Sequence, residues 1–242
     1  MTDYACFARF YDGIMGDRTE EVDRIRTYIG KHLPGARSLL ELGCGTGALL
    51  SGMANLSVTG IDRSPEMLSV AAHTVPGARL VQADMTAFTL PARFDVVMCM
   101  FDTVNHVTTV DGWLRLFRCA HEHLSDGGLF IFDVNTTGRL RRLAGAPPYL
   151  DEFDGKVVLM TVRSAHDGLV LWETRIFDHQ GDDIYRLHRE QIYELGVPVR
   201  EIRAALAGQF ELLEEESLDG SPVSDSSDRV FFAYRRRLAE DG

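Results

Sequence analysis

Strand-like and helix-like segments alternate through the first half of this chain, and that alternation restricts its fold more than any other feature. The strand-like runs are short and almost wholly apolar, which is typical of parallel strands buried on both faces. Successive strand–helix units require a parallel sheet with right-handed crossovers, so the pattern predicts a doubly wound α/β fold. The expected strands lie at residues 38–42, 57–61, 78–82, 94–100 and 129–134.

Long β-rich stretches replace this pattern after residue 150. Turn signals at Asp167-Gly168 and at residues 180–182 separate them, and Asp-Gly between apolar runs favours a hairpin. We therefore expect an inserted antiparallel β subdomain of three strands, at 156–163, 169–177 and 184–195. A helix at 199–207 and a closing antiparallel pair at 210–215 and 229–235 follow.

These changes divide the chain into three expected parts. The parts are an N-terminal helical cap at residues 1–36, an α/β domain at 37–150 and 196–242, and the antiparallel insertion at 151–195.

Charge and cysteine usage restrict the partners of the chain. Its 242 residues include 36 acidic and 25 basic ones, a formal net charge of −11, which repels polyanions, so we expect no nucleic-acid partner. No apolar run approaches the roughly 18 residues of a membrane helix, so we expect no membrane partner. The cysteines show no paired close spacing, which favours reduced thiols and a cytoplasmic location. They are Cys6, Cys44, Cys99 and Cys119.

The most informative motif is a glycine loop at residues 40–47, Leu-Glu-Leu-Gly-Cys-Gly-Thr-Gly, between the first expected strand and a helix. Glycines there let a ligand approach the backbone closely, although a tight structural turn is the alternative. The spacing G-x-G-x-G differs from the G-x-G-x-x-G of dinucleotide sites. Glu41 precedes the first glycine, near where a pyrophosphate would lie, and a carboxylate there disfavours phosphate and suits a cationic ligand.

Two further carboxylates end neighbouring strands at the same edge of the expected sheet. Asp62 follows the second strand, where a carboxylate can accept hydrogen bonds from the two ribose hydroxyls of an adenosine. Asp84 closes the third strand and could accept from an adenine amino group. Met67 and Met85 could enclose the ring, with core packing as the alternative for Met67. All lie where open α/β sheets bind ligands.

In these motifs the chain resembles the class I S-adenosylmethionine-dependent methyltransferases. The resemblance rests on the glycine loop and on residues 60–64, 82–85 and 124–128, in the expected order. It implies a Rossmann-like sheet of seven strands with the last one antiparallel. It also implies S-adenosyl-L-methionine as cofactor and methyl transfer by in-line displacement to an N or O atom of a small molecule. The cofactor-binding residues that it implies are Tyr11, Glu41, Gly43, Cys44, Gly45, Gly47, Asp62, Arg63, Met67, Asp84, Met85 and Met100.

Within that superfamily the chain is similar to small-molecule methyltransferases related to the amino-sugar and glycine N-methyltransferases. The similarity rests on Ala-Arg-Phe-Tyr-Asp at residues 8–12, on residues 100–106 and on the late β insertion. In such relatives a tyrosine at the position of Tyr11 covers the methionine end of the cofactor, whereas packing on an N-terminal helix is the alternative. The insertion implies an acceptor lid or an oligomer contact, the latter in a homodimer.

The segment after the fourth strand is expected beside the transferable methyl group. An amine acceptor must be neutral and a hydroxyl must lose its proton, so a general base there is useful. A histidine titrates near neutrality, which makes His106 the candidate base, with packing as the alternative. Asn105 could orient the acceptor or cap a turn. Asp102 could pair with an amine or bind backbone amides.

We expect no metal, because His121 and His123 lie two apart on an expected helix and face different directions. Within the insertion, His188 and Glu190 share a strand face and could line a lid. A protein or peptide methyltransferase and a cofactor-binding regulatory protein without turnover are alternative functions. Glu41 and the glycine spacing oppose an NAD-dependent oxidoreductase.

Overall fold

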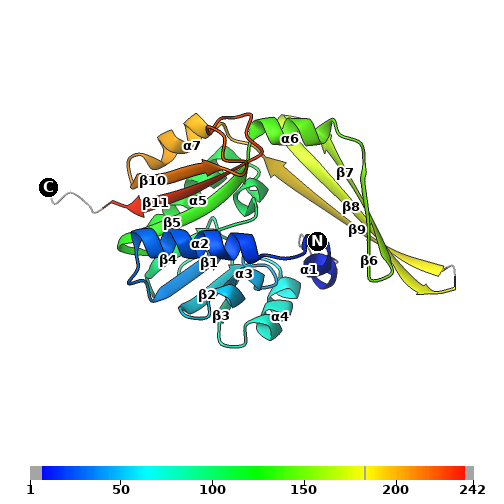
Figure 1. Cartoon of the computed structure of the whole chain (residues 1–242), viewed down its shortest axis with the longest axis horizontal. Coiled ribbons are helices and arrows are strands. Elements are labelled where there is room, and N and C mark those ends of the chain that lie inside the picture. Colours follow the sequence, from blue (N-terminus) through cyan, green and yellow to red (C-terminus); the bar gives the residue numbers. More distant parts are fainter. Residues whose placement is uncertain (1–6, 183, 238–242) are drawn as a thin grey trace.

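The computed structural model describes residues 7–182 and 184–237 and contains two β-sheets (Figure 1). The larger sheet has seven strands in the order β10-β11-β5-β4-β1-β2-β3. Strands β1 to β5 are parallel to one another, whereas β11 is antiparallel to both β5 and β10. This confirms the Rossmann-like sheet with its last strand antiparallel. The strands are β1 (Ser38–Leu42), β2 (Ser57–Asp62), β3 (Arg79–Gln82), β4 (Phe94–Cys99), β5 (Leu124–Asn135), β10 (Phe210–Ser217) and β11 (Arg229–Arg236).

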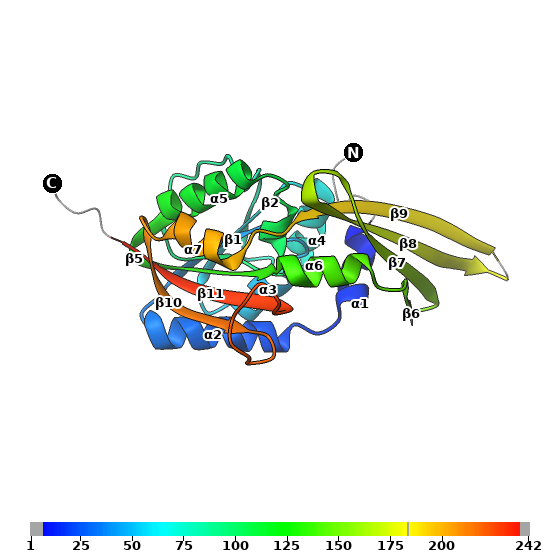
Figure 2. The same ribbon diagram turned by 90° about the horizontal axis from the view of Figure 1, so that it is seen from above.

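Helices cover both faces of this sheet, as Figures 1 and 2 show. Side chains alternate between the faces along each strand, so Leu39 and Leu40 of β1 enter different cores. Helices α2, α3 and α4 pack on the face of Leu39, and α5 and α7 on the face of Leu40. The helices are α2 (Thr19–His32), α3 (Ala48–Gly52), α4 (Pro65–Thr74), α5 (Val110–His123) and α7 (Val199–Leu206).

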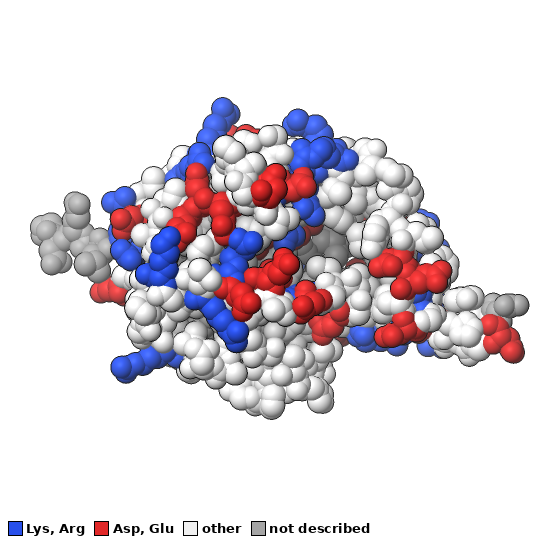
Figure 3. Space-filling model, viewed as in Figure 1, with Lys and Arg blue, Asp and Glu red and all other residues white. Residues whose placement is uncertain are grey.

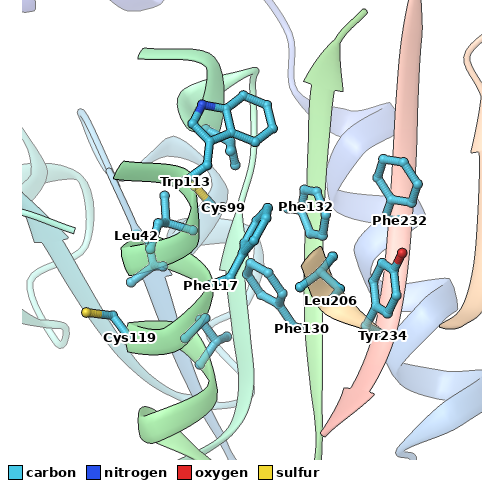
Figure 4. Packing of buried hydrophobic residues seen from close by; sticks show 14 of the residues in the cluster. Leu42, Cys99, Trp113, Phe117, Cys119, Phe130, Phe132, Leu206, Phe232 and Tyr234 are labelled. Atoms are coloured by element: carbon cyan, nitrogen blue, oxygen red, sulfur yellow. The ribbon is translucent and has the colours of Figure 1, made fainter. Parts of the chain in front are cut away.

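The core under α5 is rich in aromatic rings (Figure 4). Phe130 and Phe132 of β5 stack with their centroids 4.7 Å apart, and Phe132 stacks on Phe232 of β11 at 5.0 Å. Trp113 of α5 is also buried, and its Nε1 donates to the carbonyl oxygen of Val107 at 2.8 Å. This hydrogen bond attaches the loop after β4 to helix α5.

The second sheet is antiparallel, with strands in the order β6-β7-β8-β9 (Figure 1). It confirms the antiparallel insertion, but it contains one strand more than the expected three. Strand β6 lies at the edge of the sheet with its residues largely exposed, so its sequence lacks the apolar alternation that marks the other strands. The strands are β6 (Tyr149–Phe153), β7 (Lys156–Ser164), β8 (Leu169–Gly181) and β9 (Ile184–Leu195).

Two other local features differ from expectation. Helix α6 (Thr137–Ala144) was not expected. Leu140 is its one buried residue, so its sequence lacks the apolar stripe by which a helix is recognised. Residues 126–128, just before the expected strand at 129–134, form a bulge within β5, where the pairing with β4 shifts and Gly127 adopts φ 74°. The Asp-Gly at residues 167–168 does form a turn, within η2 (His166–Gly168).

Helix α1 (Ala8–Met15) packs on the second sheet near the edge of the larger one. Phe7 and Phe10 form a small apolar cluster with Val158 of β7 and Ile176 of β8. A Cβ on Gly13 would lie 2.6 Å from the Phe153 ring, so a glycine permits this close approach. Helix α1 is therefore held against the second sheet.

Cys44, Cys99 and Cys119 are free and buried, whereas Cys6 lies outside the described residues. Helices of the described part of the chain are all too short or too polar to cross a bilayer. On the face in Figure 3, acidic and basic side chains alternate over the surface without a uniformly basic area.

Candidate active site

A cavity of about 260 Å³ opens at the carboxyl ends of the parallel strands. The glycine loop after β1, the ends of β2 and β3 and the segment after β4 all contribute to its walls, and Tyr11 of α1 completes them. The expected site residues that line this cavity are Tyr11, Gly43, Gly45, Asp62, Arg63, Met67, Asp84, Met85 and His106.

Two backbone amides of the glycine loop donate hydrogen bonds to β2. The amide of Cys44 donates to the carbonyl oxygen of Ile61, and the amide of Gly45 donates to Oδ2 of Asp62, both at 2.9 Å. Gly43 adopts φ 67°, and a Cβ there would lie 2.4 Å from a methyl group of Thr103. A larger residue would therefore strain the backbone and push on the opposite wall of the cavity.

Asp62 holds the local backbone and can still accept further hydrogen bonds. Its Oδ1 accepts from the amide of Ser64 at 2.8 Å, while Oδ2 accepts from the glycine loop. Each carboxylate oxygen has a further lone pair, which leaves room for two hydroxyl donors from the cavity. Burial raises the pKa of Asp62, although its backbone hydrogen bonds oppose that shift.

Glu41 does not line the cavity and is almost fully buried beneath the glycine loop. Its Oε2 has no hydrogen-bond partner among the described residues. Burial, with a smaller contribution from Asp62, raises the pKa of Glu41 well above its usual range. A buried carboxyl group without a partner is destabilising, so a donor or cationic group supplied at this end of the cavity would be favoured.

The opposite end of the cavity combines one exposed carboxylate with apolar side chains. Oδ1 of Asp84 accepts from both the amide and the hydroxyl of Thr86 at 2.8 Å, which fixes the carboxylate at the cavity wall. Met67 and Met85 line the same space. Such a mixture suits a planar heterocycle with an amino group at its edge.

Tyr11 brings α1 into the cavity wall. The helix is tied to the glycine loop by the hydroxyl of Thr46, which donates to Asp12 at 2.7 Å. The guanidinium of Arg18 lies over the Tyr11 ring at 5.6 Å and over the Phe101 ring at 4.7 Å. Burial raises the pKa of Tyr11, so its phenol stays neutral near pH 7.

Several expected cofactor residues support the site from behind the wall. Cys44 and Met100 are buried in the core, and a Cβ on Gly47 would lie 3.2 Å from Cβ of Ala71 in α4. None of the three lines the cavity, so they shape the loop and the strand end.

The backbone after β4 adopts an unusual conformation. Phe101 and Asp102 both have positive φ, 58° and 50°, which is rare for residues other than glycine and stores strain. The amide of Asp102 donates to Oδ2 of the buried Asp133 at 3.0 Å. Arg229, at the start of β11, pairs with both Asp102 and Asp133. These contacts hold Phe101 and the following η1 (Thr103–His106) against the cavity.

Two carboxyl groups lie close to His106. Nε2 of His106 lies 3.9 Å from Oδ2 of Asp102 and 3.9 Å from Oε1 of Glu194, which comes from β9. Burial would raise the pKa of Asp102, but the guanidinium of Arg229 lowers it overall. Burial and the nearby Asp102 raise the pKa of Glu194 to about 8, and burial raises that of Asp133 to about 6.

Asn105 is fully buried and does not line the cavity. Its Nδ2 donates to the carbonyl oxygens of Asn135 and Leu195 at 3.0 and 2.9 Å, and its Oδ1 accepts from the amide of Asn135 at 3.0 Å. Its side chain therefore binds η1 to the ends of β5 and β9.

Comparison with known proteins identifies a methyltransferase domain around this cavity. Residues 39–128 match the model of a methyltransferase domain. The structure is similar to an S-adenosylmethionine-dependent methyltransferase from Clostridium acetobutylicum, with a TM-score of 0.86 and 24% identity over 97% of this chain and 99% of that one. It is also similar to the S-adenosylmethionine-bound amino pentose methyltransferase CalS10 from Micromonospora echinaspora, with a TM-score of 0.77 and 26% identity over 98% of each chain.

A shorter similarity joins the first half of the chain to a third relative, dTDP-4-amino-2,3,4,6-tetradeoxy-D-glucose N,N-dimethyltransferase from Saccharopolyspora spinosa. The two are 32% identical over 132 residues, which cover 52% of this chain and 53% of the relative.

The chain is an S-adenosylmethionine-dependent methyltransferase. This activity accounts for the cavity, because its glycine loop and two strand-end carboxylates lie where the cofactor of this class is expected. In this methyltransferase the free lone pairs of Asp62, at the cavity wall, fit the hydroxyls of a ribose, whereas Glu41 lies behind the glycine loop.

Sequence reasoning missed several residues of the methyltransferase site. Phe101, Thr103 and Arg115 line the cavity. Phe101 and Thr103 belong to the segment that the sequence placed beside the methyl group, but neither was singled out, and Arg115 lies on α5 outside any motif. Asp133 and Arg229 lie far from the glycine loop in sequence. Only the packing of β5 against β11 brings them together, so no local pattern announces them.

The ligand atoms of Asp102, His106 and Glu194 lie within 4.8 Å of one another, close enough to hold a cation. Arg229 already pairs with Asp102, so its guanidinium neutralises much of the negative charge that would attract a metal ion. We therefore keep the prediction that the methyltransferase works without a metal.

Proposed function

We propose that this methyltransferase moves the methyl group of S-adenosyl-L-methionine to the amine nitrogen of a small polar molecule, with an amino sugar as the favoured class. The carrying observation is that a single cavity joins the glycine loop and Asp62 to His106, which has the carboxyl groups of Asp102 and Glu194 behind it. One end thus suits an adenosine and the other a basic acceptor.

The residues that would hold the cofactor lie on four segments of the cavity wall. Asp62 would accept from the ribose hydroxyls, and Asp84 from the adenine amino group, with Met67 and Met85 against the ring. Tyr11 would cover the methionine end. Bound there, S-adenosylmethionine supplies an activated methyl group on a sulfonium.

At the acceptor end the protein must align a lone pair and remove a proton. An ammonium ion has no lone pair to offer, so the acceptor must react as the neutral amine. His106 can take the proton, and the carboxylates of Asp102 and Glu194 can stabilise the imidazolium that results. Alignment and exclusion of water contribute the rest of the rate.

An amine is favoured over a hydroxyl by the proton acceptor at this end of the cavity. His106 lines the cavity with carboxyl groups behind it, and it can take the proton of an ammonium group far more readily than that of an alcohol. Two of the similar proteins are named for methylation of amino sugars, which supports the same class.

The second sheet, with α1, would form a lid on the acceptor side, and a homodimer through this sheet is the alternative use of the insertion. The described residues offer no observation that favours a peptide methyltransferase, an oxidoreductase or a regulatory protein without turnover. We therefore keep the small-molecule proposal alone.

A matched acceptor panel tests the proposal. Nucleotide-linked amino sugars are compared with the same sugars carrying a hydroxyl in place of the amine, and with a mixed peptide library. Release of S-adenosylhomocysteine is followed for each. We expect turnover with amines only. Turnover confined to hydroxyl sugars or to peptides would contradict the proposed acceptor class.

A further inference from the structure

The inserted sheet delivers one carboxylate to the histidine of the cavity. Oε1 of Glu194 lies 3.9 Å from Nε2 of His106, as far as Oδ2 of Asp102 does from the same nitrogen. Only 4% of the Glu194 side chain is exposed, and it does not line the cavity, whereas His106 does. Glu194 therefore reaches an acceptor only through His106.

The position of Glu194 is fixed from both sides. Its Oε2 accepts from Nδ2 of Asn135 at 3.1 Å, and the neighbouring carbonyl oxygen of Leu195 accepts from Asn105. Asn105 lies beside His106 in η1. The side-chain amide of Asn105 thus joins η1 to the end of β9. This link fixes the separation of Glu194 and His106.

Glu194 is buried, and a buried carboxylate is destabilising unless it is paired. Among the described residues the basic side chain within ion-pair distance of it is His106. Arg229 contacts the other two carboxylates of the cluster. The charged and titratable groups that face Glu194 are Asp102 and His106 from η1 and its cap, Asp133 from β5, Arg139 from α6 and Arg229 from β11.

We propose that Glu194 is a positioning residue for methyl transfer, which orients His106 and stabilises the imidazolium formed when His106 takes the proton of the acceptor nitrogen. In that step the N–H bond of the acceptor breaks, its electron pair stays on the nitrogen, and the proton forms a new N–H bond on the ring. The inserted sheet is then part of the reaction site as well as a cover for it. This inference rests on the proposed function.

The raised pKa of Glu194, about 8, agrees with this role. A carboxyl group with a raised pKa holds a proton readily, so the pair of Glu194 and His106 can take up the acceptor's proton without building an isolated buried charge. Without Glu194 the imidazolium would face Asp102, which Arg229 already pairs with.

The test compares Glu194→Gln with Glu152→Gln, an exposed glutamate of β6 in the same sheet. The His106 ring is titrated by NMR in the ligand-free protein with labelled histidine, and its signal is assigned with His106→Gln. We expect the ring to titrate at lower pH in Glu194→Gln, because a stabilising carboxylate is lost. Glu152→Gln should titrate as the wild type.

Kinetics provide the second readout. Because a positioned base contributes about 10²–10⁴ in rate, loss of its positioning partner should lower kcat about 10-fold. The affinity for S-adenosylhomocysteine should stay within about twofold. Glu194→Asp keeps the charge and should titrate closer to the wild type, and it replaces the Gln variant if that one fails to fold.

An unchanged His106 titration in Glu194→Gln overturns the inference, and so does a loss of kcat without a titration shift, which would show packing alone. If the wild type methylates no amine, the proposed function fails instead. The NMR titration still decides whether Glu194 controls His106, because it needs neither cofactor nor acceptor.

Discussion

At the residue scale, the cofactor end of the cavity depends on carboxylates that also hold the backbone. Asp62 illustrates this, because its two oxygens accept from the amides of Gly45 and Ser64 while they face the cavity. The sequence could predict a carboxylate at this strand end, but it could not separate a ligand contact from a helix cap. The structure gives Asp62 the position for both.

Asp62→Ala should therefore lower affinity for S-adenosylhomocysteine by about 1.5–3 kcal/mol, because a charged acceptor of two hydroxyls is lost. Calorimetry measures it, corrected for the folded fraction. Asp95→Ala is the matched control, since Asp95 also accepts from two backbone amides, those of Arg37 and Ser38, but lies outside the cavity wall. Equal affinity losses in the two variants would contradict a ribose contact.

Asp133 gives a prediction on pH. Its pKa of about 6 lies above the usual 3.8, because burial opposes ionisation. A carboxyl group with a raised pKa contributes its stability below pH 4 and loses it as the pH rises to about 6. The stability of the wild type minus that of Asp133→Asn should therefore fall from pH 4 to pH 6 and then stay constant. Urea unfolding at several pH values measures this difference, and a difference that rises with pH contradicts the account.

At the element scale, strands with strong apolar patterns could be predicted and weakly patterned elements could not. β1, β2, β4 and β9 match their expected ranges to within a residue. Burial imposes an apolar run on the first three, whereas β9 is largely exposed and its start follows from the turn signal at residues 180–182. β6 and α6 escaped because exposed positions can take almost any polar residue. The same holds for the site. Local motifs predicted the cofactor end of the cavity, but no local motif predicted the contacts between β5, β9 and β11.

Asn105 shows how one side chain can join elements that no local pattern relates. Asn105→Ala should destabilise the protein by about 2–4 kcal/mol, because backbone groups of Asn135 and Leu195 lose their buried partners. Urea unfolding checks this value. Asn55→Ala, at an exposed turn, should change stability little. If both variants unfold alike, Asn105 does not join η1 to the two strands.

At the scale of the whole molecule, α1 connects the wall of the cavity to the second sheet. Phe10 and Tyr11 lie on the same short helix, the first packed on the second sheet and the second on the cavity. The sequence could predict an insertion from its change of pattern, but the contact with α1 depends on tertiary packing alone. Binding of a ligand in the cavity should therefore change the mobility of the second sheet.

Hydrogen exchange tests that coupling. Addition of S-adenosylhomocysteine and an amine acceptor should slow exchange in α1 and in β7 to β9, because their contacts close over the cavity. The exposed edge strand β6 serves as the internal control and should change least. Protection that depends on protein concentration and not on ligand would indicate an oligomer contact and contradict the lid.

The most direct measurement of the central claim follows the methyl carbon itself. The methyltransferase is incubated with S-adenosylmethionine labelled with ¹³C in the methyl group and with a nucleotide-linked amino sugar, and the product is examined by two-dimensional NMR. The account predicts a labelled carbon bonded to nitrogen, formed slowly in His106→Ala and at the wild-type rate in Glu152→Gln. A labelled carbon bonded to oxygen, or label that stays on the cofactor while the protein binds it, would contradict the account.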